Sequence, residues 1–168
     1  MYKIYKIMFI VIAEIYIKLI MPLIDIVINF VILPFTYIGK KTRVNVQEAL
    51  LKRDYCSIKE KKDFLVNRYK YVHDPVYGLF NWNWRSIRSA AFFDFKGDCD
   101  KFAFLAKFLL PYGKRYSILP LNPKFWKEMH VVYVYRGCVY SSGYILSMDF
   151  EEYLSIAYGG IDYYVAEY

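Results

Sequence analysis

The apolar run near the start of the chain constrains its fold more than any other feature. Residues 4–38 are almost all apolar. As one helix they would extend about 50 Å at 1.5 Å per residue, beyond the roughly 30 Å core of a bilayer, so we expect Pro22 and Pro34 to interrupt them. The sequence therefore predicts a hydrophobic, membrane-associated helical segment over residues 1–39 and a globular domain over residues 40–168.

A polar stripe crosses this apolar segment. Glu14, Lys18, Asp25 and Asn29 follow spacings of four, seven and four, which places them in one sector of a continuous helix. Such a stripe is costly against lipid. We therefore expect it to face a partner helix, a second copy of the chain or water, and one hypothesis makes the stripe the functional part, forming a membrane oligomer or pore that the domain regulates.

Two other interpretations of the segment stay open, a cleaved signal peptide and a buried soluble helix. Lys3 and Lys6 precede the apolar run, as in a signal peptide, but Glu14 and Lys18 interrupt it early and no small-x-small cleavage site follows. The flank after residue 38 is more basic than Lys3 and Lys6. A single span would thus leave the domain in the cytoplasm.

The formal charge of +7 is concentrated beside the apolar segment. Residues 40–70 hold ten Lys and Arg against four acids. Positive charge in that place suits anionic lipid headgroups, so no nucleic-acid partner is expected. The three cysteines, at 56, 99 and 138, are an odd number without metal-type pairs. Neither a disulfide framework nor a metal or organic cofactor is predicted.

The local patterns predict an α+β architecture, with helices before and after an antiparallel sheet. Asn45 with Glu48 and Ser57 with Glu60 are spaced as capping boxes for two helices, the second ending at His73-Asp74-Pro75. Asp98 and Asp149 are expected to cap two further helices. The strands are expected at 116–119, 130–135, 139–145 and 161–166, with a hairpin turn at Arg136-Gly137.

A cysteine and a histidine form the candidate catalytic pair. Cys99 opens an apolar helix after Gly97-Asp98, and His130 opens a valine-rich strand 31 residues later. A helix N-terminus favours a thiolate and can bind an oxyanion, whereas carboxylates as close as Asp98 and Asp100 raise a thiol pKa. The sequence thus predicts a thiol nucleophile with an imidazole base.

The group that would orient the imidazole is ambiguous. A tight hairpin places Ser141 and Ser142 beside residues 132 and 131, so either serine can reach His130, depending on register. Asp149 is the remaining alternative, although it is expected to cap a helix.

Residues 69–143 resemble bacterial transglutaminase-like cysteine peptidases. The resemblance rests on Tyr71-x-x-Asp74, Trp82-Asn83-Trp84, Gly97-Asp98-Cys99-Asp100 with Phe102-Ala103, and His130-Val131-Val132. It implies a papain-like core in which a cysteine-bearing helix packs on an antiparallel sheet. It further implies Cys99 as nucleophile, His130 as base and Trp84 near the oxyanion site. The third member of that family's triad is usually an acid, and Ser142 occupies the matching place here.

Two functions follow as hypotheses. The first is a membrane-tethered cysteine hydrolase or acyltransferase that acts on peptide or glutamine-type amide bonds of a protein or peptide substrate. The second is a catalytically inactive domain of the same fold that serves as a membrane-bound binding or assembly module, which Ser142 in place of an acid favours.

Overall fold

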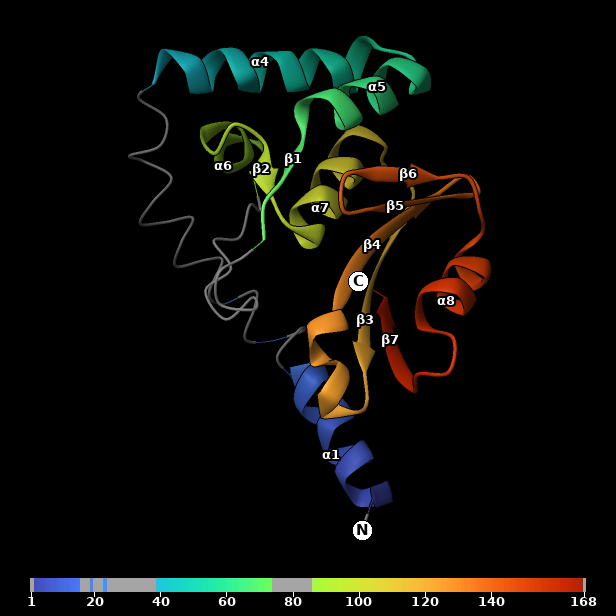
Figure 1. The fold of residues 1–168 in the computed structure, drawn as a ribbon. Helices are drawn as coiled ribbons and strands as arrows, with labels where there is room; N and C mark the ends of the chain where they lie inside the picture. The colour runs from blue at the N-terminus through green and yellow to red at the C-terminus, as the bar shows by residue number, and fades with distance from the viewer. Residues whose placement is uncertain (1, 16–18, 20–22, 24–38, 74–85, 168) are drawn as a thin grey trace.

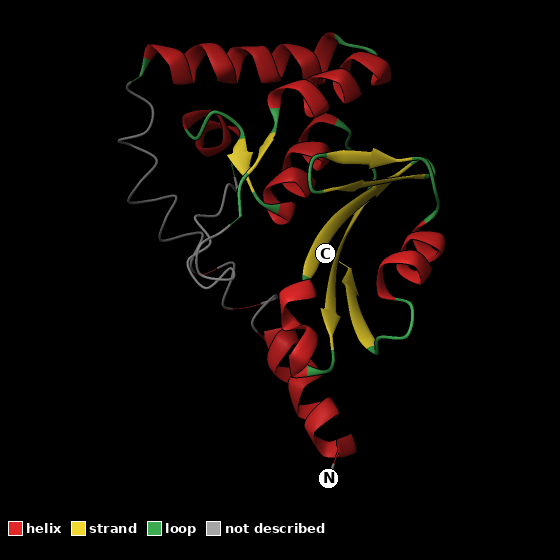
Figure 2. Ribbon diagram, in the orientation of Figure 1, coloured by secondary structure: helices red, strands yellow, loops and turns green. Residues whose placement is uncertain are grey.

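A five-stranded antiparallel sheet forms the centre of the protein (Figure 2). The structure, a computed structural model, describes residues 2–15, 19, 23, 39–73 and 86–167. The strand order is β6-β5-β4-β3-β7. The strands are β3 (Lys114–Pro120), β4 (His130–Tyr135), β5 (Cys138–Ser141), β6 (Tyr144–Leu146) and β7 (Tyr163–Glu167). The expected α+β class with an antiparallel sheet is confirmed.

Helices cover both faces of this sheet. Those described are α1 (Tyr2–Ile15), α4 (Lys40–Tyr55), α5 (Ile58–Arg68), α6 (Ile87–Phe92), α7 (Cys99–Leu109), α8 (Phe150–Tyr158) and a 3-10 helix at Pro123–Glu128. Figure 1 shows α7 and α8 on opposite sides of the sheet, with α4 and α5 beyond α7. A short parallel pair, β1 (Lys70–Tyr71) and β2 (Lys96–Gly97), brings the end of α5 beside the start of α7.

The alternation of side chains along the strands creates two hydrophobic cores. Tyr133 and Tyr140 are fully buried in the core that α7 covers. Ile118, Val132 and Val139 are fully buried in the core that α8 covers. Consecutive residues of β4 therefore contact different helices, so a residue's place in the strand decides which helix it meets.

The strand β4 also fixes the C-terminal end of α7. The Tyr133 hydroxyl donates to the carbonyl of Leu110 and accepts the Gly113 N–H at 2.8 Å. A Cβ at position 113 would lie 2.4 Å from the backbone oxygen of Val134, so only glycine permits this close approach. The buried face of α7 includes Phe102, Leu105, Ala106 and Leu109, as expected of an apolar helix that follows Cys99.

The expected membrane helix is not borne out, because no helix in the described part of the chain is both long and apolar enough to cross a bilayer. Of the predicted polar stripe, Lys18, Asp25 and Asn29 lie outside the described residues, and Glu14 accepts a hydrogen bond from the Tyr164 hydroxyl.

Two predicted helix boundaries were wrong. Asn45 and Glu48 do not begin a helix, because α4 starts at Lys40 and buries Asn45 in its interior. The helix α5 has the predicted Ser57–Glu60 capping box but ends at Arg68 rather than at His73. In both places, contacts with distant residues outweigh the local pattern.

One predicted strand is also divided. Residues 139–145 form the end of β5 and the start of β6, joined by a turn at Ser142-Gly143. Both residues have positive φ values, 48° and 92°, which a continuous strand does not allow. Ser141 is therefore the last residue of β5, whereas Ser142 lies in the turn.

Candidate active site

The segment before Cys99 is built around a buried lysine. The side chain of Lys101 is 5% exposed, and its Nζ lies 3.0 Å from Asp98 Oδ1 and 3.7 Å from Asp100 Oδ1. A Cβ at Gly97 would lie 2.3 Å from Cδ of Lys101, so the glycine makes room for the lysine stem. Asp98 occupies the N-cap position but makes no side-chain cap hydrogen bond. The predicted cap was wrong because this carboxylate pairs with Lys101.

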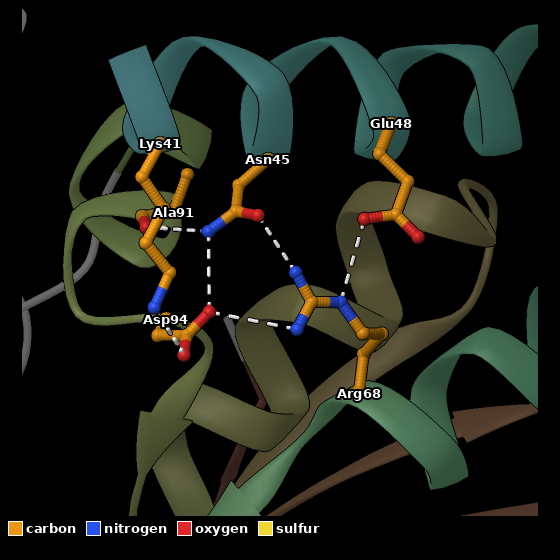
Figure 3. A network of polar contacts seen from close by, with 6 residues as sticks. All are labelled: Lys41, Asn45, Glu48, Arg68, Ala91 and Asp94. Carbon is orange, nitrogen blue, oxygen red and sulfur yellow. Dashed lines mark hydrogen bonds and ion pairs between the residues drawn. The ribbon is translucent and has the colours of Figure 1, made fainter. Parts of the chain in front are cut away.

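A second cluster of polar side chains joins α4, the end of α5 and the segment after α6, upstream of Gly97 in the sequence. It comprises Lys41, Asn45, Glu48, Arg68, Ala91 and Asp94 (Figure 3). The Asn45 amide donates to the Ala91 carbonyl and to Asp94 Oδ1, both at 3.2 Å, and accepts from Arg68 at 2.7 Å. Asp94 and Phe95 both have a φ of 56°, an uncommon conformation for such residues. The cluster therefore anchors a left-handed turn that leads directly into β2 and Gly97.

Cys99 is the first residue of α7 and is half-buried. Burial, then the charges of Asp100 and Asp98, raise the pKa of its thiol to about 12. Hydrogen bonding to the backbone at Val131 and Asp100 acts in the opposite direction but is weaker. The thiol is therefore protonated at neutral pH, and the helix N-terminus does not by itself yield a thiolate.

His130 is the first residue of β4, as predicted, and its ring is neutral. Burial lowers the pKa of the imidazole to about 4, although the charge of Asp98 acts to raise it. Its Nε2 lies 2.7 Å from Ser141 Oγ and 3.5 Å from Ser142 Oγ. The structure thus places both serines at the imidazole and favours Ser141 over the predicted Ser142.

These groups gather where β4 begins. The backbone of Val131, next to His130, contacts Cys99. Among the hydrogen bonds of these described residues, none joins the thiol directly to the imidazole. Such contacts often tighten only when substrate binds.

Three further residues bear on the candidate site. Trp84 lies outside the described residues. Asp149 caps α8 by accepting the Glu152 N–H at 2.8 Å, as predicted, and is therefore engaged away from the imidazole. Sequence reasoning missed Tyr153, whose hydroxyl lies 3.3 Å from Ser141 Oγ. The available signal was its position four residues after the cap, on the apolar face of α8.

A shallow depression lies elsewhere on the domain. It has a volume of about 350 Å³ and is lined by residues 112–114 and 134–136. Residues 112–114 follow the C-terminal end of α7 and residues 134–136 lie at the end of β4, whereas Cys99 and His130 lie at the opposite ends of that helix and strand. The depression is therefore not part of the candidate active site.

No family model, curated protein or solved structure matches the chain.

Proposed function

We propose that the domain is a thiol-dependent hydrolase or acyltransferase that acts on an amide bond of a protein or peptide. The observation that carries this proposal is the 2.7 Å contact of His130 Nε2 with Ser141 Oγ at the start of β4, where the backbone of the next residue, Val131, contacts the half-buried Cys99. A nucleophile, a base and a group that orients the base are the parts that covalent acyl transfer needs.

The reaction begins from a neutral pair. As the Cys99 sulfur attacks the carbonyl carbon, its proton passes to Nδ1 of His130, in the tautomer whose Nε2–H donates to Ser141 Oγ. The imidazolium then protonates the leaving amine as the C–N bond breaks. Water or a second amine attacks the thioester and regenerates the thiol. The first backbone N–H groups of α7 are suited to bind the oxyanion.

The test is acylation of the three cysteines by p-nitrophenyl acetate near neutral pH, located by peptide mass spectrometry. We expect His130→Gln to slow acylation of Cys99 on the order of 100-fold, as loss of a general base does, and to leave Cys56 and Cys138 unchanged. His73→Gln is the matched control, because His73 is the chain's other histidine. Equal rates at Cys99 in the native protein and His130→Gln would overturn the proposal.

A second candidate function is a catalytically inactive binding or assembly module. Two observations favour it: the thiol pKa is raised to about 12, and a hydroxyl stands where a carboxylate would stabilise an imidazolium. The same experiment separates the two functions, since an inactive module predicts no dependence of Cys99 on His130. Folding of each variant is checked by circular dichroism.

A further inference from the structure

The imidazole of His130 and the hydroxyl groups of Ser141 and Tyr153 form a row of polar groups. His130 Nε2 lies 2.7 Å from Ser141 Oγ, which lies 3.3 Å from the Tyr153 hydroxyl. Ser141 is 8% exposed and Tyr153 is 9% exposed, so the row is screened from solvent. Ser142 Oγ, at 3.5 Å from Nε2, is beyond a normal hydrogen-bond length to that nitrogen. The partner that determines the state of Nε2 is therefore Ser141.

The positions of the protons follow from the donors in this row. Within the described structure, Ser141 is the hydrogen-bond partner of the Tyr153 hydroxyl, so the tyrosine proton is paired when it points to Ser141 Oγ. The serine proton then points to Nε2 of His130. The opposite order leaves a buried phenol proton unpaired, and an order in which Ser141 accepts from both neighbours leaves the serine proton unpaired, so both are unfavourable. In the paired order, Nε2 accepts and carries no proton.

A neutral imidazole carries one proton, so an unprotonated Nε2 leaves it on Nδ1. We propose that Ser141, whose oxygen is occupied by the Tyr153 hydroxyl, holds the proton of the resting His130 ring on Nδ1 and is thus a positioning residue for the Cys99–His130 pair. The importance of this inference rests on the proposed function, because the tautomer matters to chemistry only if His130 serves Cys99.

In this resting tautomer, His130 cannot accept the proton of the Cys99 thiol. Nδ1 cannot take the thiol proton while it carries its own, and Nε2 is engaged by the serine hydroxyl. Catalysis requires Ser141 to change from donor to acceptor, so that the ring proton moves to Nε2. A carboxylate at position 141 can only accept hydrogen bonds. Ser141→Asp therefore favours the Nε2–H form and still accepts the Tyr153 hydroxyl.

The tautomer is measured by nitrogen NMR of the full chain labelled with ¹⁵N-histidine. The chain has only two histidines, and His73→Gln assigns their signals. We expect a protonated Nδ1 in the native protein and a protonated Nε2 in the neutral form of Ser141→Asp. Ser141→Ala removes the donor to Nε2, so the native preference for Nδ1–H is lost. Ser142→Ala is the matched control, since that hydroxyl lies 3.5 Å from Nε2, and it retains the native pattern.

Each outcome decides one of the two proposals. A native His130 ring protonated on Nε2, or a Ser141→Ala ring identical to the native one, overturns the tautomer inference, while His130-dependent acylation of Cys99 leaves the proposed function standing. Conversely, a reversed tautomer in Ser141→Asp together with acylation of Cys99 that does not depend on His130 leaves the inference standing and removes the proposed function. If Ser141→Asp does not fold, Ser141→Ala alone decides the tautomer.

Discussion

The two sides of Cys99 hold their polar groups in different ways. On the α7 side, the contacts are ionic: Lys101 binds two carboxylates, and Arg68 and Asn45 bind Asp94. On the α8 side, the contacts around His130 are hydroxyl groups of Ser141 and Tyr153. The ionic contacts fix the course of the backbone, whereas the hydroxyl contacts fix the position of a proton and add no charge beside the imidazole.

This difference explains the protonation of the pair. Burial, and then the charges of Asp100 and Asp98, raise the pKa of the Cys99 thiol, and burial lowers the pKa of His130 against the opposing charge of Asp98. Both effects favour the neutral forms. We expect the ionic contacts on the α7 side to stabilise the fold, and the hydroxyl contacts around His130 on the α8 side to determine how stability changes with pH.

The largest effect is expected for Lys101→Met. The substitution removes the buried ammonium and leaves the carboxylates of Asp98 and Asp100 facing each other, 14% and 17% exposed. We expect the free energy of unfolding to fall by about 3 kcal/mol, measured by urea denaturation. Lys107→Met, at an exposed position of the same helix, is the control and should change it by less than about 0.5 kcal/mol. Equal losses would show that the ion cluster is not structural.

Asn45→Ala should have the next largest effect. Asn45 is 4% exposed, and its loss leaves the Ala91 carbonyl and the Arg68 guanidinium short of a partner. We expect a loss of about 2 kcal/mol in the free energy of unfolding. The exposed Gln47→Ala on the same helix is the control. A loss as small as that of the control would mean that α4 is held by apolar contacts alone.

The buried His130 ring should dominate the loss of stability at acidic pH. The pKa of His130 is about 4 in the folded protein, against 6.5 for an ordinary histidine. Between these values the unfolded chain binds an extra proton, so stability is complete above the higher value and falls as the pH is lowered, by up to about 1.4 kcal/mol per pH unit. His130→Gln should remove this fall, while His73→Gln should not. Parallel stability curves for all three proteins would refute the neutral-ring account.

The smallest effect is expected for Lys41→Ala. Its Nζ lies 3.0 Å from Asp94 Oδ2, but the lysine side chain is 75% exposed. Exposed ion pairs contribute little, so the free energy of unfolding should change by less than about 0.5 kcal/mol. A loss close to that of Asn45→Ala would show that the number of ionic contacts, rather than their burial, determines stability on this side.

Local patterns in the sequence predicted the parts of the fold that depend on neighbouring residues. The Ser57–Glu60 box, the Asp149 cap, the buried face of α7 and the start of β4 at His130 all follow from such patterns, and the structure has each of them. The α+β class was predicted from the order of these helices and strands along the chain.

The remaining features depend on residues far apart in the chain. Asn45 looked like a helix start because its partners, Arg68 and Ala91, are 23 and 46 residues away. The choice between Ser141 and Ser142 required the turn at Ser142-Gly143, and Tyr153 required the packing of α8 on the sheet. Periodicity and spacing carry no information about such contacts.

The attachment of α7 to β4 at both ends limits how the site can adjust. The first turn meets the backbone of Val131, and the last carbonyl meets the hydroxyl of Tyr133, two positions further along the same strand face. A helix tethered in this manner cannot slide or tilt as a lever when a ligand arrives. Any induced fit must come instead from rotation of the cysteine, serine and histidine side chains, which favours responses on the timescale of rotamer exchange over those of domain closure.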